Sequence, residues 1–356
     1  MEGYDVYQDI SERTEGCIYI GVVGPVRTGK STFIKRFMDL LVLPNMDNEF
    51  KRERTRDELP QSANGKTIMT TEPKFVPNEP IELTLRENAK FKVRLVDCVG
   101  YLVEGAMGHL EDNSPRMVNT PWFEDRIPFE EAAEIGTRKV IADHSTIGLV
   151  VTTDGSITDL PRRSYIEAEE RVIKELKELE KPFIVALNSA RPKAQETIEL
   201  REALETKYNT PVMIIDALKM EMDDLEGILG KILFEFPARE INFHIPRWMD
   251  TLELDHWLKQ GIVDSIRMNL SEVNRIRDID DAIRKFDGAE NLQAVEISDM
   301  RLGEGVVNIT ISLEDGLFYR VLGEVSGYSL EGGYQLVALV KELAQSKREY
   351  DKVKSA

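Results

Sequence analysis

The chain is poor in cysteine. Its 356 residues include two, Cys17 and Cys98, and both fall in apolar stretches typical of core strands. A disulfide framework is therefore not expected, and the usage of cysteine favours a reducing compartment. The four histidines are scattered without the spacing of metal ligands, which argues against a metal site built on histidine.

Long apolar runs and an excess of positive charge are also lacking. The first twenty residues carry acidic groups and no signal-like apolar core, and no stretch approaches ~18 uninterrupted apolar residues. The formal net charge of −18 argues against broad binding of nucleic acid and against electrostatic attachment to anionic lipid. With 42% hydrophobic and 31% charged residues, the composition indicates a globular protein, which we expect in the cytoplasm.

The strongest positive signal is residues 24–31, which match the phosphate-binding pattern G-x-x-x-x-G-K-[ST] at every fixed position. Residues 17–23 form an uncharged apolar run that predicts a buried parallel strand, and residues 32–41 carry apolar side chains at helical spacing. This context outweighs the alternative of a glycine turn with an incidental lysine. The expected nucleotide-binding residues are Gly24, Pro25, Val26, Arg27, Thr28, Gly29, Lys30, Ser31 and Thr32.

Each part of this loop has an expected task. Backbone N–H groups and the N-terminus of the following helix hold phosphate oxygens. Lys30 reaches the terminal phosphates, and the Ser31 hydroxyl binds Mg²⁺.

A second motif, Asp97-Cys98-Val99-Gly100, ends a predicted core strand. An aspartate at this place can hold Mg²⁺, usually through water, and the Gly100 amide can contact the γ-phosphate. The stretch 101–144 that follows is unusually long for such a loop, and its apolar residues predict a partly folded insertion.

Between the two motifs lies a polar stretch that contains Thr70 and Thr71. NTPases of the switch type need a threonine here, whose hydroxyl completes the Mg²⁺ coordination and whose carbonyl helps to place the attacking water. The sequence does not choose between the two threonines. Two threonines in an ordinary loop remain the alternative.

The base-reading position departs from the GTPase pattern. A predicted strand runs into Asn188-Ser189-Ala190-Arg191, where GTPases of this architecture have N-K-x-D. Asn188 remains as a nucleotide-binding residue, whereas Ser189 replaces the lysine and Arg191 the aspartate that reads guanine. Because that buried acceptor rejects the wrong base most strongly, its loss favours ATP over GTP.

Apolar runs alternate with helical stretches through the first two thirds of the chain. This alternation predicts an α/β domain of the P-loop NTPase class, with a doubly wound and mostly parallel sheet, over residues 1–237. Residues 238–356 predict a smaller α+β domain. There, residues 307–313 alternate, Asp315-Gly316 offers a turn and residues 317–321 alternate again, so we expect a β-hairpin.

Together these motifs resemble the stage IV sporulation protein A family, spore-coat morphogenetic ATPases of endospore-forming bacteria that are related to translation-factor-like GTPases. The resemblance covers the whole chain, and we expect the family's C-terminal region to be absent from it. It implies that Lys30 acts on the phosphates, Asp97 on magnesium, and Thr70 and Thr71 as sensors.

The resemblance also implies a cofactor pair, ATP and Mg²⁺, and a set of partners. The family polymerises with itself into a static basement layer of the spore coat, in the mother-cell cytoplasm at the forespore surface. Other spore-coat proteins are implied partners, and so is the forespore membrane, reached through an anchoring protein or the C-terminal region. Nucleic acid is not among them.

Turnover by one isolated subunit is expected to be slow. Tyr101 stands where many small GTPases have a glutamine that orients the attacking water, and a phenol is a poor substitute. Arg27 resembles the arginine of guanylate-binding proteins that self-association moves onto the transferring phosphate. The alternative, a solvent-exposed loop residue, stays open.

Two other functions stay open at this point. A nucleotide-dependent switch could act through partners without polymerising. A P-loop kinase is disfavoured, because D-x-x-G has no role there and no arginine-rich lid is evident.

Overall fold

In the computed structural model the chain forms two compact units. The first comprises Met1–Pro237 together with Arg301–Gly305, and the second comprises Ala238–Met300 and Val306–Ala356. The structure describes residues 5–46, 48–60, 73–85, 89–106, 110–111, 114–120 and 123–355.

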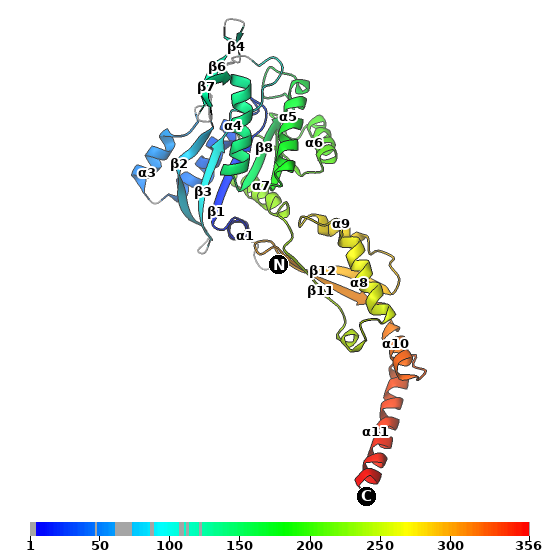
Figure 1. Cartoon of the computed structure of the whole chain (residues 1–356). Coiled ribbons are helices and arrows are strands. Elements are labelled where there is room, and N and C mark those ends of the chain that lie inside the picture. Colours follow the sequence, from blue (N-terminus) through cyan, green and yellow to red (C-terminus); the bar gives the residue numbers. More distant parts are fainter. Residues whose placement is uncertain are drawn as a thin grey trace. The chain divides into compact units, whose positions relative to one another are not determined.

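A six-stranded sheet forms the centre of the first unit, in the order β10-β9-β8-β1-β3-β2 (Figure 1). Five strands are parallel, and the edge strand β2 is antiparallel to β3. The inner strands read as nearly continuous apolar runs because both faces of a parallel sheet are covered. The bounds are β1 (Cys17–Val23), β2 (Lys74–Leu85), β3 (Ala89–Asp97), β8 (Ile147–Thr153), β9 (Phe183–Asn188) and β10 (Val212–Ile215).

Helices connect these strands and bury their apolar sides. Side chains of α4, α5 and α6 join those of β1, β8 and β9 in one buried cluster, and α1 packs with α7. The mixed α/β architecture with a mainly parallel sheet is as predicted. The helices are α1 (Val6–Arg13), α2 (Lys30–Phe37), α3 (Glu49–Asp57), α4 (Phe129–His144), α5 (Ile166–Glu178), α6 (Gln195–Tyr208) and α7 (Met222–Phe234), with short helical turns η1 (Met38–Val42), η2 (Leu43–Asn45) and η3 (Arg162–Tyr165).

The expected insertion over 101–144 is only partly an insertion. Its second part is α4, a regular helix whose Val140 and Ile141 lie in the main core. Strand β6 pairs antiparallel with β7, and Val118 packs with Phe129 at the start of α4. The short strands before α4 are β4 (Leu110–Glu111), β5 (Ser114–Pro115), β6 (Met117–Thr120) and β7 (Phe123–Pro128).

The second unit is a smaller α+β domain with a three-stranded sheet in the order β11-β13-β12. Its elements are β11 (Glu240–His244), η4 (Arg247–Thr251), α8 (Trp257–Leu270), α9 (Asp278–Arg284), β12 (Leu292–Arg301), β13 (Val306–Leu313), α10 (Leu317–Ser326) and α11 (Gly333–Ser355). Among the helices in the described ranges, none is both long and apolar enough to cross a membrane.

The predicted hairpin across Asp315-Gly316 is wrong. β13 forms as expected, but residues 317–326 are helix α10, and β13 is hydrogen-bonded to β11 and to the preceding strand β12. Leu317 and Val321 are buried and lie four residues apart, so a single helical face contains both. An alternation over five residues fits a strand equally well, and the helix is the alternative that packs in this domain.

Candidate nucleotide-binding site

The loop 24–31 connects β1 to α2, and close contacts require its glycines. Gly24 has φ +136°, and a Cβ there would lie 2.2 Å from the carbonyl oxygen of Val151. Gly29 has φ +94°, and a Cβ there would lie 2.3 Å from Nδ2 of Asn188. Both angles belong to backbone regions that L side chains rarely adopt. The loop is therefore held by its neighbours in one compact path.

Helix α2 begins at Lys30, directly after the loop. Phe33 N–H donates to the carbonyl of Gly29 at 2.9 Å, the first bond of the helix. The N–H groups before it have no acceptor within the helix, and they carry its partial positive charge. Ser31 and Thr32 occupy this first turn, so the expected phosphate-holding amides share one helix end.

Lys30 is buried, with 6% of its surface exposed. Its Nζ donates to the carbonyl of Pro25 at 2.6 Å and to that of Gly24 at 3.3 Å. Burial lowers the pKa of Lys30 to about 8, and the charges of Asp97 and Cys98 oppose that shift in part. The lysine is thus a desolvated cation whose present acceptors are neutral carbonyls, and an anion in the loop would stabilise its charged form.

Asp97 ends β3 beside the loop. Its Oδ2 accepts a hydrogen bond from the Ser31 hydroxyl at 2.8 Å, whereas its buried Oδ1 has no hydrogen-bond partner among the described residues. Burial raises the pKa of Asp97, while the Ser31 bond and the charges of Lys30 and Lys74 lower it. A hydroxyl and a carboxylate with an unsatisfied oxygen are suitable ligands for Mg²⁺, directly or through water.

Ser31 and Asp97 are a small set of ligands, of the size that Mg²⁺ uses at phosphate sites, and not a metal site built entirely from protein side chains. Within the part of the chain that the structure describes, no group of three or more His, Cys, Asp or Glu side chains could hold a metal ion. Magnesium at phosphate sites commonly uses one or two protein ligands and takes the rest from phosphates and water. The donor set of Ser31 and Asp97 has this limited size.

Gly100 lies against the loop, and its position also excludes a side chain. Its φ is +90°, and a Cβ there would lie 2.5 Å from Lys30 Nζ and 2.5 Å from the Gly24 carbonyl. Tyr101 then pairs with the loop, since Val26 N–H donates to its carbonyl at 2.9 Å. The second motif therefore touches the phosphate loop through its backbone.

The Tyr101 side chain points elsewhere. It is 2% exposed, and its hydroxyl donates to Glu175 on α5, with Arg171 over its ring at 5.2 Å. Burial and this carboxylate raise the pKa of the phenol. The phenol therefore packs against α5 with its hydroxyl engaged by Glu175, and slow turnover by an isolated subunit stays a prediction.

Arg27 is half-buried within the loop and has φ +62°, an uncommon angle for a residue with a side chain. Among the described residues its guanidinium makes no hydrogen bond or ion pair. Its charge lies near Tyr165, where it partly opposes the rise in pKa that burial imposes on that phenol. The role of Arg27 stays a prediction.

Asn188 connects the end of β9 to the loop. Its Nδ2 donates to the Thr28 carbonyl at 3.0 Å, and its Oδ1 accepts from Ala217 N–H at 3.0 Å. Ser189 is fully buried and Arg191 is exposed. The asparagine is thus fixed against the loop.

The sequence reasoning missed Asp154, just after β8. Asp154 accepts hydrogen bonds from the hydroxyls of Ser189 at 2.6 Å and Thr197 at 3.1 Å, and from the Ser156 amide at 2.9 Å. Burial alone would raise its pKa, but the hydrogen bonds outweigh burial and lower it. In the sequence, the pair Asp154-Gly155, directly after the apolar run 147–153, could have indicated a polar residue at the end of this strand. Thr70 and Thr71 lie outside the described residues.

Comparisons with known proteins agree on a family. Models described as stage IV sporulation protein A, ATPase domain, and as the middle domain of that protein match residues 1–237 and 238–356. The chain is similar to stage IV sporulation protein A of Clostridioides difficile (strain 630), with 53% identity over 352 residues, 99% of this chain and 72% of the relative. The namesake proteins of Bacillus subtilis (strain 168) and Bacillus anthracis are 50% and 48% identical over 356 residues, again covering 72% of each relative. As its motifs predicted, the chain belongs to the stage IV sporulation protein A family.

Proposed function

We propose that the chain is a P-loop ATPase that binds and hydrolyses ATP with Mg²⁺. On this proposal it also self-assembles into a static polymer, the basement layer of the spore coat on the forespore surface. The observation that carries the chemistry is the arrangement of Lys30, Ser31 and Asp97 in a domain that matches an ATPase family model.

Phosphate binding would use groups that are already in place. Lys30 would exchange its two loop carbonyls for phosphate oxygens, which compensate a buried ammonium better because they are charged. The amides of the loop and of the first turn of α2 would hold further oxygens. Ser31 and Asp97 would hold Mg²⁺, which supplies charge neutralisation between the β- and γ-phosphates.

Hydrolysis needs groups that place water and stabilise charge in the transition state. Thr70 and Thr71 remain the proposed sensors, one of them as a magnesium ligand. The Tyr101 hydroxyl is hydrogen-bonded to Glu175, so we do not assign it a role in hydrolysis. Arg27 is the proposed source of additional positive charge in the transition state. It would act when a neighbouring subunit moves it, so assembly and hydrolysis would be coupled.

ATP is the proposed nucleotide. Arg191 replaces the carboxylate that reads guanine, and Ser189 bonds to Asp154. Neither residue offers guanine the paired acceptor on which GTPases depend, so discrimination in favour of GTP is lost.

The proposed partners are further copies of the chain, other spore-coat proteins and the forespore membrane through an anchoring protein or a C-terminal region. Nucleic acid is not proposed, given the net charge of −18. The proposed place is the mother-cell cytoplasm, and the names of the relatives, which refer to sporulation, support it.

The decisive experiment measures phosphate release from ATP and from GTP across protein concentration, together with sedimentation with and without ATP. We expect ATP to be preferred and specific activity to rise as polymer forms. The Arg27→Ala variant should flatten that rise while its ATP affinity stays within a few-fold of wild type. Hydrolysis without sedimentable polymer would favour the switch that acts through partners, and specific activity independent of concentration would remove the role of Arg27.

A further inference from the structure

Helix α11 carries apolar side chains that its own domain leaves exposed. Leu343 is 48% exposed, Tyr350 64% and Val353 76%. Figure 1 draws α11 in red as a single long helix that leads to the C-terminus. Scattered apolar residues on a surface are ordinary, but a row of them along one helix points to a partner.

Leu343, Tyr350 and Val353 belong to a heptad repeat, whereas Tyr334, Val337 and Val340, which are also exposed on α11, lie outside it. Positions spaced alternately by three and four residues are all apolar except for one serine, and they define a seam along α11. The first two seam residues are half-buried in the domain, and the seam then continues into solvent. Heptad spacing of this kind is the pattern that two helices use to pack as a coiled coil. The seam consists of Leu336, Leu339, Leu343, Ser346, Tyr350 and Val353.

The charges that flank the seam specify its partner. Glu342 and Glu349 occupy the g positions on one side, and Lys347 and Lys354 the e positions on the other. In a parallel pair, each g residue faces the e residue five positions later on the partner helix. Glu342 would therefore face Lys347 of a second copy, and Glu349 would face Lys354. An antiparallel pair would instead place like charges opposite each other.

We propose that α11 is a self-association surface that forms a parallel two-stranded coiled coil with α11 of a second copy of this chain. The contact needs no nucleotide and is independent of the proposed ATP chemistry. A two-fold pair of this kind uses the same surface on both subunits and closes on itself. It therefore joins two subunits, or two polymer strands, but cannot extend a filament alone.

The test exchanges the flanking charges in the whole chain. Glu342→Lys/Glu349→Lys and Lys347→Glu/Lys354→Glu each place like charges opposite each other in a homodimer. Sedimentation velocity without nucleotide should show the wild type passing from monomer to dimer with concentration, and each variant associating roughly tenfold more weakly or worse. An equimolar mixture of the two variants should recover association, because opposite charges then face each other again.

A matched control changes the charge of the same helix away from the seam. Lys341 and Arg348 occupy f positions, so Lys341→Glu/Arg348→Glu should associate as the wild type does. Phosphate release by all variants is followed in parallel, so that loss of the dimer and loss of ATPase activity are read separately. A mixture no better than its components, or a control that dissociates equally, would overturn the proposal.

Orientation has its own test. Parallel helices bring Tyr350 next to its equivalent, so Tyr350→Cys should form an intermolecular disulfide on mild oxidation, whereas Gln345→Cys, on the outer face, should not. The wild type gives the background from Cys17 and Cys98. Equal cross-linking at both positions, or a wild type that stays monomeric at every concentration, would assign the face to a different partner.

Discussion

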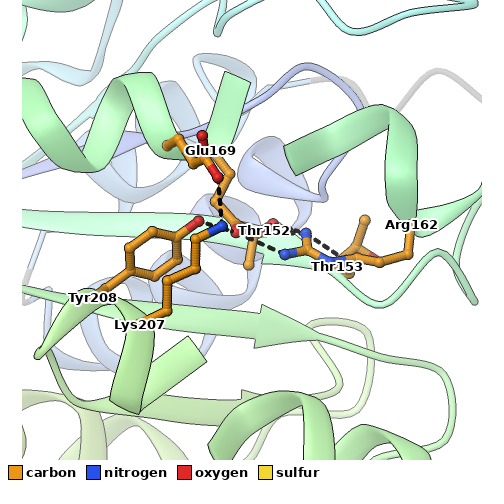
Figure 2. Close-up of polar contacts among 7 residues, drawn as sticks. Thr152, Thr153, Arg162, Glu169, Lys207 and Tyr208 are labelled. Atoms are coloured by element: carbon orange, nitrogen blue, oxygen red, sulfur yellow. Dashed lines mark hydrogen bonds and ion pairs between the residues drawn. The ribbon is translucent and has the colours of Figure 1, made fainter. Parts of the chain in front are cut away.

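The ion pair between Arg162 and Glu169, which lies against β8, allows a direct test of what stabilises the first domain. Arg162 donates two hydrogen bonds to Glu169, of 2.7 Å from Nη1 and 2.6 Å from Nη2, and Figure 2 draws both side chains with their polar neighbours. Glu169 is fully buried and also accepts from the hydroxyls of Thr152 and Tyr208. The carboxylate therefore accepts four hydrogen bonds from three residues, of which only Arg162 carries a charge.

Replacing Arg162 with alanine would leave Glu169 buried without its counter-charge. Removing one partner of a buried pair costs about 3–5 kcal/mol, and the two remaining hydroxyl donors place the expected loss near the lower end. On the same helix, the Lys174 and Glu178 charges are 3.9 Å apart with 78% and 54% of their side chains exposed. Lys174→Ala should therefore cost only about 0.3–0.5 kcal/mol.

Urea unfolding followed by far-ultraviolet circular dichroism measures both losses, and hydrogen exchange of amides in β8 and α5 locates them. The double variant Arg162→Ala/Glu169→Gln should be less destabilised than the single Arg162→Ala, because it removes the unpaired charge as well. If Arg162→Ala cost no more than Lys174→Ala, burial of the pair would not be the dominant effect and the reasoning would fail.

Three further predictions concern the nucleotide. Above about pH 8 Lys30 is mainly neutral in the free protein, so ATP binding should be accompanied by uptake of a proton, and ATP affinity should fall as the pH rises further. Calorimetry in buffers with different ionisation heats measures this uptake, which the Lys30→Ala variant should not show. Asp97→Ala should retain much ATP binding but lose hydrolysis, measured as phosphate release, because the Mg²⁺ that Asp97 is proposed to hold acts mainly in the transition state. Unchanged turnover would contradict the assignment. Arg191→Asp with Ser189→Lys should raise GTP affinity in competition with a fluorescent ATP analogue, and wild-type protein that prefers GTP would refute the proposed base selectivity.

Local chemistry made much of the loop predictable. The strand before Gly24 and the helix from Lys30 both form as expected, since buried apolar runs and helical spacing are dictated by nearby residues. The contact of Ser31 with Asp97 also follows from topology, because β1 and β3 are parallel neighbours whose ends meet at one edge. The roles proposed for these residues stay predictions.

Contacts between distant segments could not be predicted in this way. Nothing near Tyr101 in the sequence identifies Glu175, 74 residues later, as the acceptor of its hydroxyl. Asp154 gains donors from Ser189, directly after β9, and from Thr197 on α6. Residues 317–321 become part of α10 because tertiary packing selects between two periodicities that a short segment satisfies equally. Tertiary structure decided each of these outcomes.

The segment after β8 connects the two ends of the candidate site. Asp154 binds Ser189 beside Asn188, and Tyr165 at the other end lies near Arg27. Arg162, between them, is fixed by its buried pair with Glu169, and a segment anchored in this way has little freedom to shift. A change in the position of Arg27 is therefore expected to arise from rotation of its own loop backbone, where φ is already uncommon, or from contact with another subunit. On the proposal that a neighbouring subunit moves Arg27, assembly, and not nucleotide binding alone, would determine when that charge reaches the phosphate.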